Sequence, residues 1–395
     1  MPQLKEVVIV SSARTAIGSF NGVFKDISAT RLGSIVINAV LERAKLEKDL
    51  VDEVIMGCVL PANLGQAPAR QAAISAGLNN STECTTINKV CGSGLKSVML
   101  AAQAIMTGDA DVIVAGGMEN MTRVPYYLDS ARFGSKLGHG KMIDGMIQDG
   151  LWDVYNDFHM GNAAELCAKE CSISREAQDE YAILSYKRAL AAQESGLFKN
   201  EIVGVEIPQR NGDPIIIDED EEPGKVNFDK LKTLRPVFDK DGTVTAANAS
   251  SINDGAAAVL VMSADRAKEL KIQPEFKIVA QASAAKKPEQ FTTAPADAIN
   301  KLLQKAELTI ADIDFYEINE AFAVVSLINN QLLKLPVEKV NINGGAIALG
   351  HPIGASGARI LTTLLHIIKN KKAKRGIASL CIGGGEASAM LVESI

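Results

Sequence analysis

The sequence is poor in the residues that build metal centres and disulfide scaffolds. Its 395 residues include six cysteines and four histidines. The cysteines lack the paired C-x-x-C spacing of a zinc site, and six of them in so long a chain do not suggest a disulfide framework. We therefore expect no bound metal and reduced thiols, as is usual in the cytoplasm.

Basic charge and long apolar runs are scarce as well. Lysine and arginine number 41 against 47 aspartate and glutamate, a net charge of −6, whereas nucleic-acid-binding domains usually carry a basic surplus. The first apolar run, 7–10, is too short for a signal peptide or a membrane span, and no later run reaches the ~20 residues of a membrane helix. We expect a cytoplasmic protein that binds neither nucleic acid nor membrane.

The chain has enough apolar material for more than one core. Hydrophobic residues make up 47% of the 395, and a single core rarely serves more than ~250–300 residues, so two or three domain-sized units are expected. The segment 43–57 can be laid over 305–319 at an offset of 262 residues, and 93–96 over 356–359 at an offset of 263. Two matches at nearly the same offset indicate that one unit occurs twice.

Each copy is predicted to contain the same succession of elements. A helix at 95–106 or 358–369 is followed by a strand-like run and then by a glycine cluster, at 116–117 or 383–385. Strands that alternate with helices favour an α/β fold of mostly parallel sheets covered on both faces. Ligands of such folds bind beyond the carboxyl ends of the strands.

The region between the copies has a different sequence pattern. Residues 121–150 show little periodicity, which is typical of a long excursion or an oligomer contact, whereas 174–195 is an amphipathic helix pattern opened by Ser174. The acidic run 218–222 is interpreted as a solvated loop, and 255–262 as a strand that rejoins the first copy. The predicted domains are an N-terminal half of 1–120 plus 248–270, an inserted loop domain of 121–247, and a C-terminal half of 271–395.

Three chemically reactive side chains sit beside glycine clusters. Cys91 begins CGSG, His351 begins HPIGASG and Cys381 begins CIGGG. Glycine leaves the backbone bare, so that N–H groups can approach a substrate oxygen, and a helix that starts just after Cys91 would favour its thiolate. The pattern suggests carbon–sulfur chemistry. The alternative, a role in packing only, is our interpretation of the other four cysteines, which are Cys58, Cys84, Cys167 and Cys171.

Six longer stretches resemble the thiolase family, and within it the acetyl-CoA acetyltransferases. They are 85–96, 112–121, 243–257, 317–322, 341–360 and 381–390. The resemblance covers nearly the whole chain and implies a duplicated α/β fold, in which two similar halves form five layers and a loop domain is inserted in the first half. It also implies reversible Claisen condensation of two acetyl-CoA molecules to acetoacetyl-CoA and free CoA.

The resemblance assigns the three reactive side chains to two half-reactions. Cys91 matches the nucleophile that attacks a thioester and holds the acetyl group. His351 matches the base that activates this thiol, since a neutral imidazole can take the proton and return it. Cys381 matches the acid/base that deprotonates the methyl group of the second acetyl-CoA.

Two oxyanion holes are implied as well. Asn319 resembles the residue that holds a water which forms one hole together with His351, and the N–H groups of Cys91 and Gly383 match the other. An asparagine after a strand is often only a turn or a cap. However, Asn319 aligns with Gly57 of the first copy, so the copies differ where only one of them needs a functional side chain.

The family further implies a narrow apolar groove for the pantetheine arm of CoA, with Phe291 and Met160 limiting acyl length. The residues expected there are Leu151, His159, Met160, Leu234, Phe238, Ala246, Ser250, Phe291, Ala321, Phe322 and Ile353. Each of these could equally be an ordinary core residue. The nucleotide end of CoA would rest on Lys225, Lys230, Lys232 or Arg235, or on nothing specific.

Two other functions stay open beside the acetyltransferase. A degradative 3-ketoacyl-CoA thiolase would share the catalytic residues but have a roomier acyl pocket around 142–160 and Phe291. A non-catalytic acyl-CoA carrier on the same scaffold need not keep Cys91, His351, Cys381 and Asn319 together. Decarboxylating condensing enzymes of this fold use one cysteine with two histidines, and Cys381 argues against them.

Departures from the family narrow the expected cofactors and partners. The potassium-binding subgroup has a tyrosine where this chain has Pro223, which makes potassium doubtful, and no other cofactor is expected beside the CoA substrates. Thiolases are dimers or tetramers, and 121–145 resembles a tetramer-forming loop, so a homotetramer is favoured.

Overall fold

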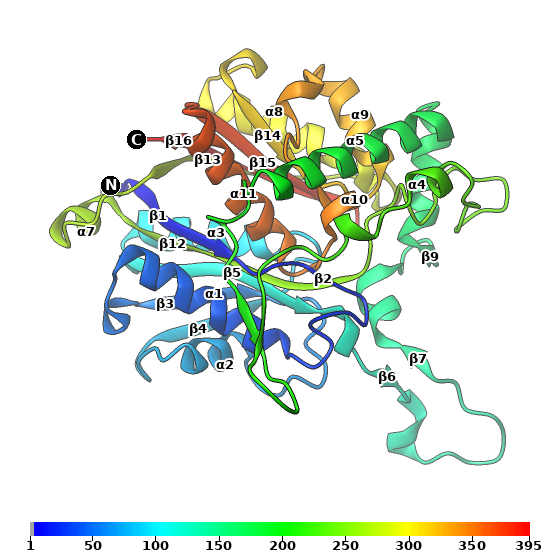
Figure 1. Ribbon diagram of the computed structural model, residues 1–395, viewed down its shortest axis with the longest axis horizontal. Helices are drawn as coiled ribbons and strands as arrows, with labels where there is room; N and C mark the ends of the chain where they lie inside the picture. Colours follow the sequence, from blue (N-terminus) through cyan, green and yellow to red (C-terminus); the bar gives the residue numbers. More distant parts are fainter. Residues whose placement is uncertain (1–3) are drawn as a thin grey trace.

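Two runs of strands, which share one internal order apart from the additional edge strand β4 of the first run, form the central sheet (Figure 1), in a computed structural model that describes residues 4–395. The first run is β4-β3-β5-β12-β1 and the second is β14-β15-β16-β13. Their bounds are β1 Val7–Arg14, β3 Glu53–Gly57, β4 Glu83–Ile87, β5 Val112–Asn120, β12 Asn253–Ser263, β13 Phe276–Ala285, β14 Phe315–Ile318, β15 Arg375–Ile382 and β16 Glu386–Ser394. The runs join at β1 and β13 through two residue pairs. The predicted duplication is confirmed.

The prediction of a mostly parallel sheet is wrong. Within the described residues, β3 pairs in parallel with β4 and β5, and β14 with β15, whereas the other pairings of this sheet are antiparallel. β15 turns straight back into β16, and β12 returns from the inserted region to run against β5. Antiparallel neighbours need no crossover helix, which is why the alternation of helices and strands did not reveal them.

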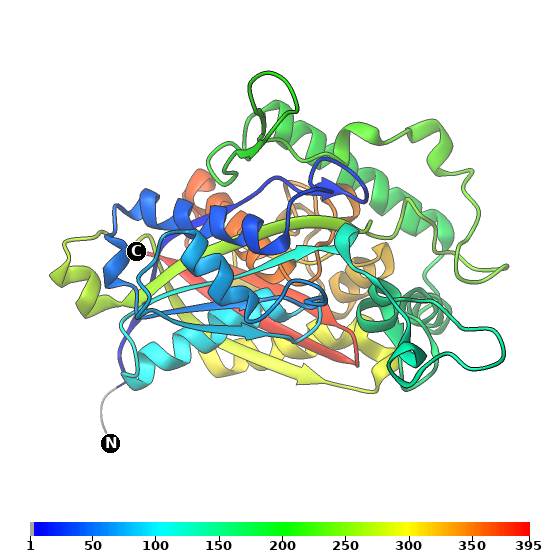
Figure 2. The ribbon, with the colours of Figure 1, turned by 90° about the horizontal axis from the view of Figure 1, so that it is seen from below.

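Helices separate and cover the two runs of strands, which gives the expected five layers (Figures 1 and 2). α3 (Ser93–Thr107) and α11 (Ser356–Lys371) pack against each other in the middle. α1 (Ala29–Ala44) and α2 (Pro68–Ser75) cover the first run, and α8 (Ala294–Ala306) covers the second. The helices expected at 95–106 and 358–369 are thereby confirmed.

Glycine allows the two central helices to meet at their N-terminal ends. A Cβ added to Gly94 would lie 2.8 Å from the Ala358 nitrogen, and one added to Gly357 would lie 2.2 Å from the Leu95 nitrogen. No larger residue fits at either place. The Ser-Gly pair that marks the repeat thus brings the segments that precede α3 and α11 close together, and these segments carry Cys91 and His351.

The inserted region lies across the ends of the strands and includes a projecting excursion around β6 and β7 (Figures 1 and 2). Its elements are β6 Tyr126–Tyr127, β7 Ile143–Asp144, β8 Trp152–Asp153, β9 Phe158–His159, α4 Met160–Glu170, α5 Arg175–Glu194, β10 Val205–Ile207, β11 Ile215–Ile217 and α6 Phe228–Leu231. Ser174 caps α5 as expected, because its hydroxyl accepts a bond from the Ala177 nitrogen. The exact domain boundaries remain a prediction.

The remaining elements are short. They are β2 Gly18–Ser19, α7 Ala264–Glu269, α9 Ala323–Leu333, α10 Ala346–Leu349, and the single-turn helices η1 Lys48–Leu50, η2 Met121–Arg123, η3 Asp129–Phe133, η4 Ile147–Leu151, η5 Pro223–Lys225, η6 Pro288–Thr293, η7 Ile310–Asp312 and η8 Val337–Lys339. Of these, η6 and α9 pack beside α4 and help to enclose the site described below.

The acidic run 218–222 is not simply a solvated loop, and this expectation is corrected at Asp220. Asp220 is buried and accepts two bonds from the Arg14 guanidinium, of 2.7 and 2.9 Å, and one from the Ile17 nitrogen. Arg14, at the end of β1, is also buried and donates to Glu201 at 2.6 Å. Paired and hydrogen-bonded in this way, buried charges can be tolerated. They fasten the inserted region to the first half.

The segment Val90–Thr107, which contains α3, passes a length and composition test for a membrane-crossing helix with a mean hydropathy of 1.2. The expectation that no segment would do so was wrong. However, 56% of this window is buried inside the fold, and α3 packs against α11, β3, β5 and β12 in the central layer, which explains its apolar character.

Candidate active site

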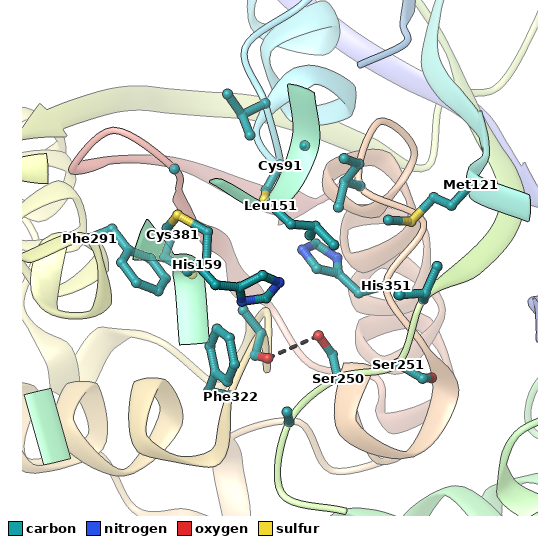
Figure 3. Close-up of a pocket in the computed structure, with 18 of the residues that line it drawn as sticks. Cys91, Met121, Leu151, His159, Ser250, Ser251, Phe291, Phe322, His351 and Cys381 are labelled. Carbon is teal, nitrogen blue, oxygen red and sulfur yellow. Dashed lines mark hydrogen bonds between the residues drawn. The ribbon is translucent and has the colours of Figure 1, made fainter. Parts of the chain in front are cut away.

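A cavity of about 290 Å³ lies where both halves and the inserted region meet (Figure 3). Cys91, His351, Cys381 and Gly383, which the sequence singled out, all line it. The cavity is also lined by the predicted groove residues Leu151, His159, Met160, Phe238, Ser250, Phe291, Ala321, Phe322 and Ile353. Residues hundreds of positions apart in the chain are thereby brought to one place.

Cys91 is held by a tight turn between β4 and α3. The Ser93 hydroxyl accepts a bond from the Lys89 nitrogen at 2.8 Å and donates one to the Val90 carbonyl at 2.7 Å. Val90 adopts a φ of 45°, which is rare for a β-branched residue. Strain of this kind persists where the surrounding structure fixes it, often beside an active site. Here it presents Cys91 just before the first turn of α3.

Cys381 lies near the carboxyl end of β15, where the chain turns into β16. The turn contains Gly384 and Gly385, both at a φ of 89°, and a Cβ on Gly385 would lie 2.5 Å from the Lys287 carbonyl oxygen. Glycine is therefore required by both conformation and space. The turn places Gly383 on the wall of the same cavity as Cys91, and the Gly383 N–H acts to lower the pKa of the Cys91 thiol.

Burial opposes ionisation of both thiols in the free protein, contrary to the expectation for Cys91. Burial raises the pKa of Cys91 to about 11, although the N–H groups of Gly383 and of Cys91 itself act in the opposite direction, and the carboxylate of Glu119 raises it further. Burial, and then the nearby Cys91, raise the pKa of Cys381 well above its ordinary value. Desolvation thus outweighs the help of the following helix.

His351 is buried and fixed in one orientation. Its backbone N–H donates to the Asn253 side chain at 2.9 Å, and its Nδ1 lies 2.6 Å from the Ser356 hydroxyl. That hydroxyl lies 2.9 Å from the Pro352 carbonyl, to which it can donate, so Nδ1 carries the hydrogen and Nε2 is the acceptor of the ring. Burial, and then Arg359, lower the pKa of His351 to about 3. The ring is a neutral base.

Asn319 lies behind His351 and outside the cavity wall. Its amide nitrogen is 3.4 and 3.5 Å from the two ring nitrogens of His351. The neighbours of Asn319 in the chain are held by the side chain of Asn341, which bonds to the N–H and the carbonyl of Ile318 at 2.8 Å. The side-chain oxygen of Asn319 is buried and has no protein partner. A polar group in this state requires a water or a ligand.

Aromatic side chains form the walls of the groove. His159 stacks on Phe238 with ring centroids 4.7 Å apart, and Phe322 contacts both Phe238 and Phe291 edge to face at 6.3 Å. The Ser250 hydroxyl donates to the Ala321 carbonyl at 2.9 Å (Figure 3), so toward a ligand it acts as an acceptor. Such a cavity suits an apolar arm with few polar groups.

Two predicted groove residues lie outside this cavity. Leu234 is 36% exposed, and Ala246 is also exposed; neither lines the wall. The lysines and the arginine considered for the nucleotide are exposed too. Six lining residues were missed, namely Val90, Met121, Gly150, Ala249, Ser251 and Ile252. All but Gly150 belong to the stretches on which the resemblance was based, and their positions in those stretches were the available signal.

Comparison with known proteins agrees with this arrangement. The model of the thiolase N-terminal domain matches residues 7–265, and that of the thiolase C-terminal domain matches residues 272–394. Among curated relatives, a cytosolic acetyl-CoA acetyltransferase of Gibberella zeae is 51% identical over 396 residues, covering both chains fully. A mitochondrial acetyl-CoA acetyltransferase of Xenopus tropicalis is 55% identical and covers 99% of this chain and 93% of its own.

A solved structure is also similar along its whole length. The crystal structure of the Bacillus anthracis acetyl-CoA acetyltransferase is 40% identical, has a TM-score of 0.97 and covers 100% of both chains. The two domain matches together span nearly all of the sequence, and the duplicated five-layer fold is shared. The chain belongs to the thiolase family.

Proposed function

We propose that the chain is an acetyl-CoA C-acetyltransferase, which condenses two acetyl-CoA molecules to acetoacetyl-CoA and free CoA and catalyses the reverse thiolysis. One observation carries this proposal. Two thiols, Cys91 and Cys381, and a neutral imidazole, His351, converge on a single small apolar cavity. The names of its curated relatives support the same activity.

In the first half-reaction, Cys91 attacks the thioester carbonyl of acetyl-CoA. Because the pKa of Cys91 is raised to about 11 and that of His351 is lowered to about 3, the thiol proton passes to Nε2 only as the carbon–sulfur bond forms. The carbonyl oxygen becomes an oxyanion and accepts bonds from the N–H groups of Cys91 and Gly383. Its collapse leaves acetyl-Cys91 and expels CoA, which takes the proton of the Cys381 thiol, so that Cys381 becomes a thiolate and His351 keeps the proton on Nε2.

In the second half-reaction, Cys381 removes a proton from the methyl group of another acetyl-CoA. The enolate oxygen is stabilised by His351 and by a water, which donates to the unpartnered oxygen of Asn319. The enolate carbon attacks the carbonyl of acetyl-Cys91, and the tetrahedral intermediate expels the Cys91 thiolate. His351 then returns its proton to the Cys91 thiolate, while Cys381 keeps the proton that it took from the methyl group, so that both thiols and the neutral imidazole are regenerated.

The cavity favours a short acyl group. Phe291 is 2% exposed and packs against Phe322, while Met160 lies within about 4 Å of a Cβ placed on Gly383. Both side chains line the cavity on which the two thiols converge. A 3-ketoacyl-CoA thiolase with a long acyl chain would need this space to be open. The remaining alternative, a carrier without turnover, gives no reason for the close approach of Cys91 to Gly383.

The excursion around β6 and β7 supports assembly into a homotetramer. Its exposed side chains include Tyr126, Leu128, Phe133, Leu137 and Met142, each at least half exposed. Apolar patches of this kind on one projecting segment mark protein interfaces.

We place the protein in the cytoplasm, consistent with the name of the Gibberella zeae relative. Pro223 offers no side-chain oxygen to a potassium ion, so we assign no cofactor beyond the CoA substrates.

The test is thiolysis of acetoacetyl-CoA by free CoA on the purified chain, beside a long-chain 3-ketoacyl-CoA. Fast cleavage of the four-carbon substrate alone is expected. Comparable cleavage of the long substrate would move the protein to the degradative class. If neither is cleaved while acyl-CoA still binds, both enzyme assignments fail and the carrier function replaces them.

A further inference from the structure

Glu119 is a fully buried carboxylate that the proposed mechanism does not use. It lies near the end of β5 with a relative exposure of 0%. Burying an ionised carboxylate is costly unless its oxygens are well satisfied. Burial raises the pKa of Glu119 to about 7, while bonds from the N–H groups of Val59, Leu60 and Gly354 and from the Cys58 thiol act in the opposite direction.

The four donors to Glu119 belong to two separate segments. The Val59 and Leu60 nitrogens lie 2.9 and 3.2 Å from its oxygens, and the Cys58 sulfur lies at 3.6 Å. The Gly354 nitrogen lies 2.8 Å from Oε2, across 235 positions of sequence. One carboxylate therefore ties the loop after β3 in the first half to the loop after His351 in the second half.

Each of these segments supports one reactive side chain. The Val59 carbonyl accepts a bond from the Asn88 side chain at 3.3 Å, and the same side chain accepts one from the Val90 nitrogen at 2.9 Å. That links 58–60 to the turn of Cys91. Gly354 lies three residues after His351 in the turn that leads into α11. The bond from its N–H to Glu119 therefore holds the segment that carries His351.

The Glu119 carboxylate and the Gly354 loop are packed too tightly for either to shift alone. A Cβ on Gly354 would lie 2.5 Å from Glu119 Oε2, and one on Gly117 would lie 2.0 Å from the Gly354 carbonyl oxygen. In addition, Val59 and Leu60 pack with Ile353 in a small core beside Cys91. A displacement of the carboxylate would therefore move the walls on both sides of the cavity.

We propose that Glu119 is a positioning residue, whose carboxylate holds segments 58–60 and 352–354 so that Cys91 and His351 face each other at the distance that proton transfer needs. This inference rests on the proposed function. Misplacement of reacting groups by about 1 Å can cost ~100-fold in rate even when the cause lies away from the chemistry. None of the hydrogen-bond partners of Glu119 lines the cavity, so we expect its loss to affect turnover more than substrate binding.

The test is the Glu119→Gln variant of the full chain, assayed for thiolysis of acetoacetyl-CoA. Glutamine keeps the shape but has one oxygen and an NH₂ group that faces N–H donors. We expect kcat to fall about 10- to 100-fold, with KM changed by no more than about twofold. A rise in KM at unchanged kcat, or wild-type kinetics, would overturn the inference.

The matched control is Asp52→Asn, at the opposite ends of β3 and β5. Asp52 also accepts two backbone N–H bonds, from Asp111 and Val112 at 2.8 and 2.9 Å, but lies far along the strands from the cavity. We expect its kcat to stay within about twofold of wild type. An equal loss of kcat in Asp52→Asn would show that weakening β3 and β5 at either end is enough to slow turnover. That result would contradict a positioning role of Glu119.

A second variant covers the case in which Glu119→Gln does not fold. Gly354→Ala keeps the carboxylate and pushes the loop away from it, so the same loss of kcat at constant KM is expected. Normal turnover in Gly354→Ala would also overturn the inference. If the wild-type chain itself fails to cleave acetoacetyl-CoA, the proposed function is at fault, whereas an active wild type with unaffected variants excludes only the role of Glu119.

Discussion

The two copies of the α/β unit share four strands and a central helix but have different residues at the ends that face the cavity. β3 ends at Gly57 where β14 is followed by Asn319, and α3 is preceded by Cys91 where the segment before α11 contributes His351. A Cβ on Gly57 would lie 2.6 Å from that of Ser93. The first copy therefore cannot accept the side chain that the second copy needs.

This difference shows how a duplicated scaffold supports one site. Both copies supply backbone of the same shape, and each supplies different chemistry: the first a nucleophile, the second a base, an amide and a second thiol. Glu119 makes the same point, because it is buried in β5 and bonded to both halves, whereas Glu386 of the second copy is partly exposed and pairs with Lys89. The shared fold sets the positions and the unshared residues set the reaction.

The largest effect is expected from the first copy's nucleophile. Cys91→Ala should lower thiolysis of acetoacetyl-CoA by about 10⁴-fold or more, since removing a nucleophile abolishes the covalent route. Mass spectrometry should show no acetyl-enzyme after incubation with acetyl-CoA. Cys84→Ala, at a half-buried cysteine away from the cavity, is the control and should keep full activity. An acetyl-enzyme in Cys91→Ala would assign the nucleophile elsewhere.

Replacement of the second copy's thiol should separate the two half-reactions. In Cys381→Ser we expect condensation to fall about 10²- to 10⁴-fold, the usual contribution of a general acid or base, while acetyl-Cys91 still forms from acetyl-CoA. Both are measured on the same sample, by mass spectrometry and by release of CoA. If the rates of acetyl transfer and condensation fall together, the assignment of the two thiols to separate half-reactions is wrong.

Asn319→Gly makes the second copy resemble the first at this position. The oxygen that would hold the catalytic water is lost, and we expect kcat to fall about 10²- to 10³-fold, as for the loss of one oxyanion donor. Formation of acetyl-Cys91 should be affected much less, because it uses the N–H groups of Cys91 and Gly383. An equal loss in both half-reactions would mean that Asn319 serves only to hold His351.

The pH dependence of Cys91 alkylation measures the effect of burial on the first copy's thiol. Because the pKa of Cys91 is raised to about 11, the reactive thiolate increases about tenfold per pH unit between pH 7 and 10. Iodoacetamide should therefore modify the free enzyme ever faster over this range, and the Cys91→Ala variant supplies the background. A plateau near pH 7 would instead indicate a thiolate stabilised by α3 and by its N–H donors.

Much of this arrangement could be predicted because it depends on local sequence. The offset of 262 to 263 residues revealed the duplication, and the contrast of Gly57 with Asn319 pointed to a functional amide. Glycine beside Cys91 and Cys381 marked the turns that the structure contains. In each case the signal lies beside the feature or in the matching segment of the other copy, so no knowledge of contacts in space was needed.

The features that could not be predicted depend on distant partners. Asp220 looked solvated because its neighbours are acidic, and only the position of Arg14, some 200 residues away, makes it a buried ion pair. The antiparallel course of β12 depends on where the chain returns after the insertion. Similarly, the pKa of Cys91 reflects desolvation by the assembled cavity, which no local motif records.

The smallest effect on turnover is expected where the insertion is fastened to the first copy. Asp220→Asn removes the charge that the buried Arg14 guanidinium pairs with at 2.7 and 2.9 Å. Breaking a buried pair typically costs about 3–5 kcal/mol, so the variant should unfold at a clearly lower temperature while kcat stays within about twofold. Calorimetry beside Asp218→Asn, an exposed position of the same acidic run, checks this. Equal stability of the two variants would mean that the second partner of Arg14, Glu201, is sufficient to hold the insertion in place.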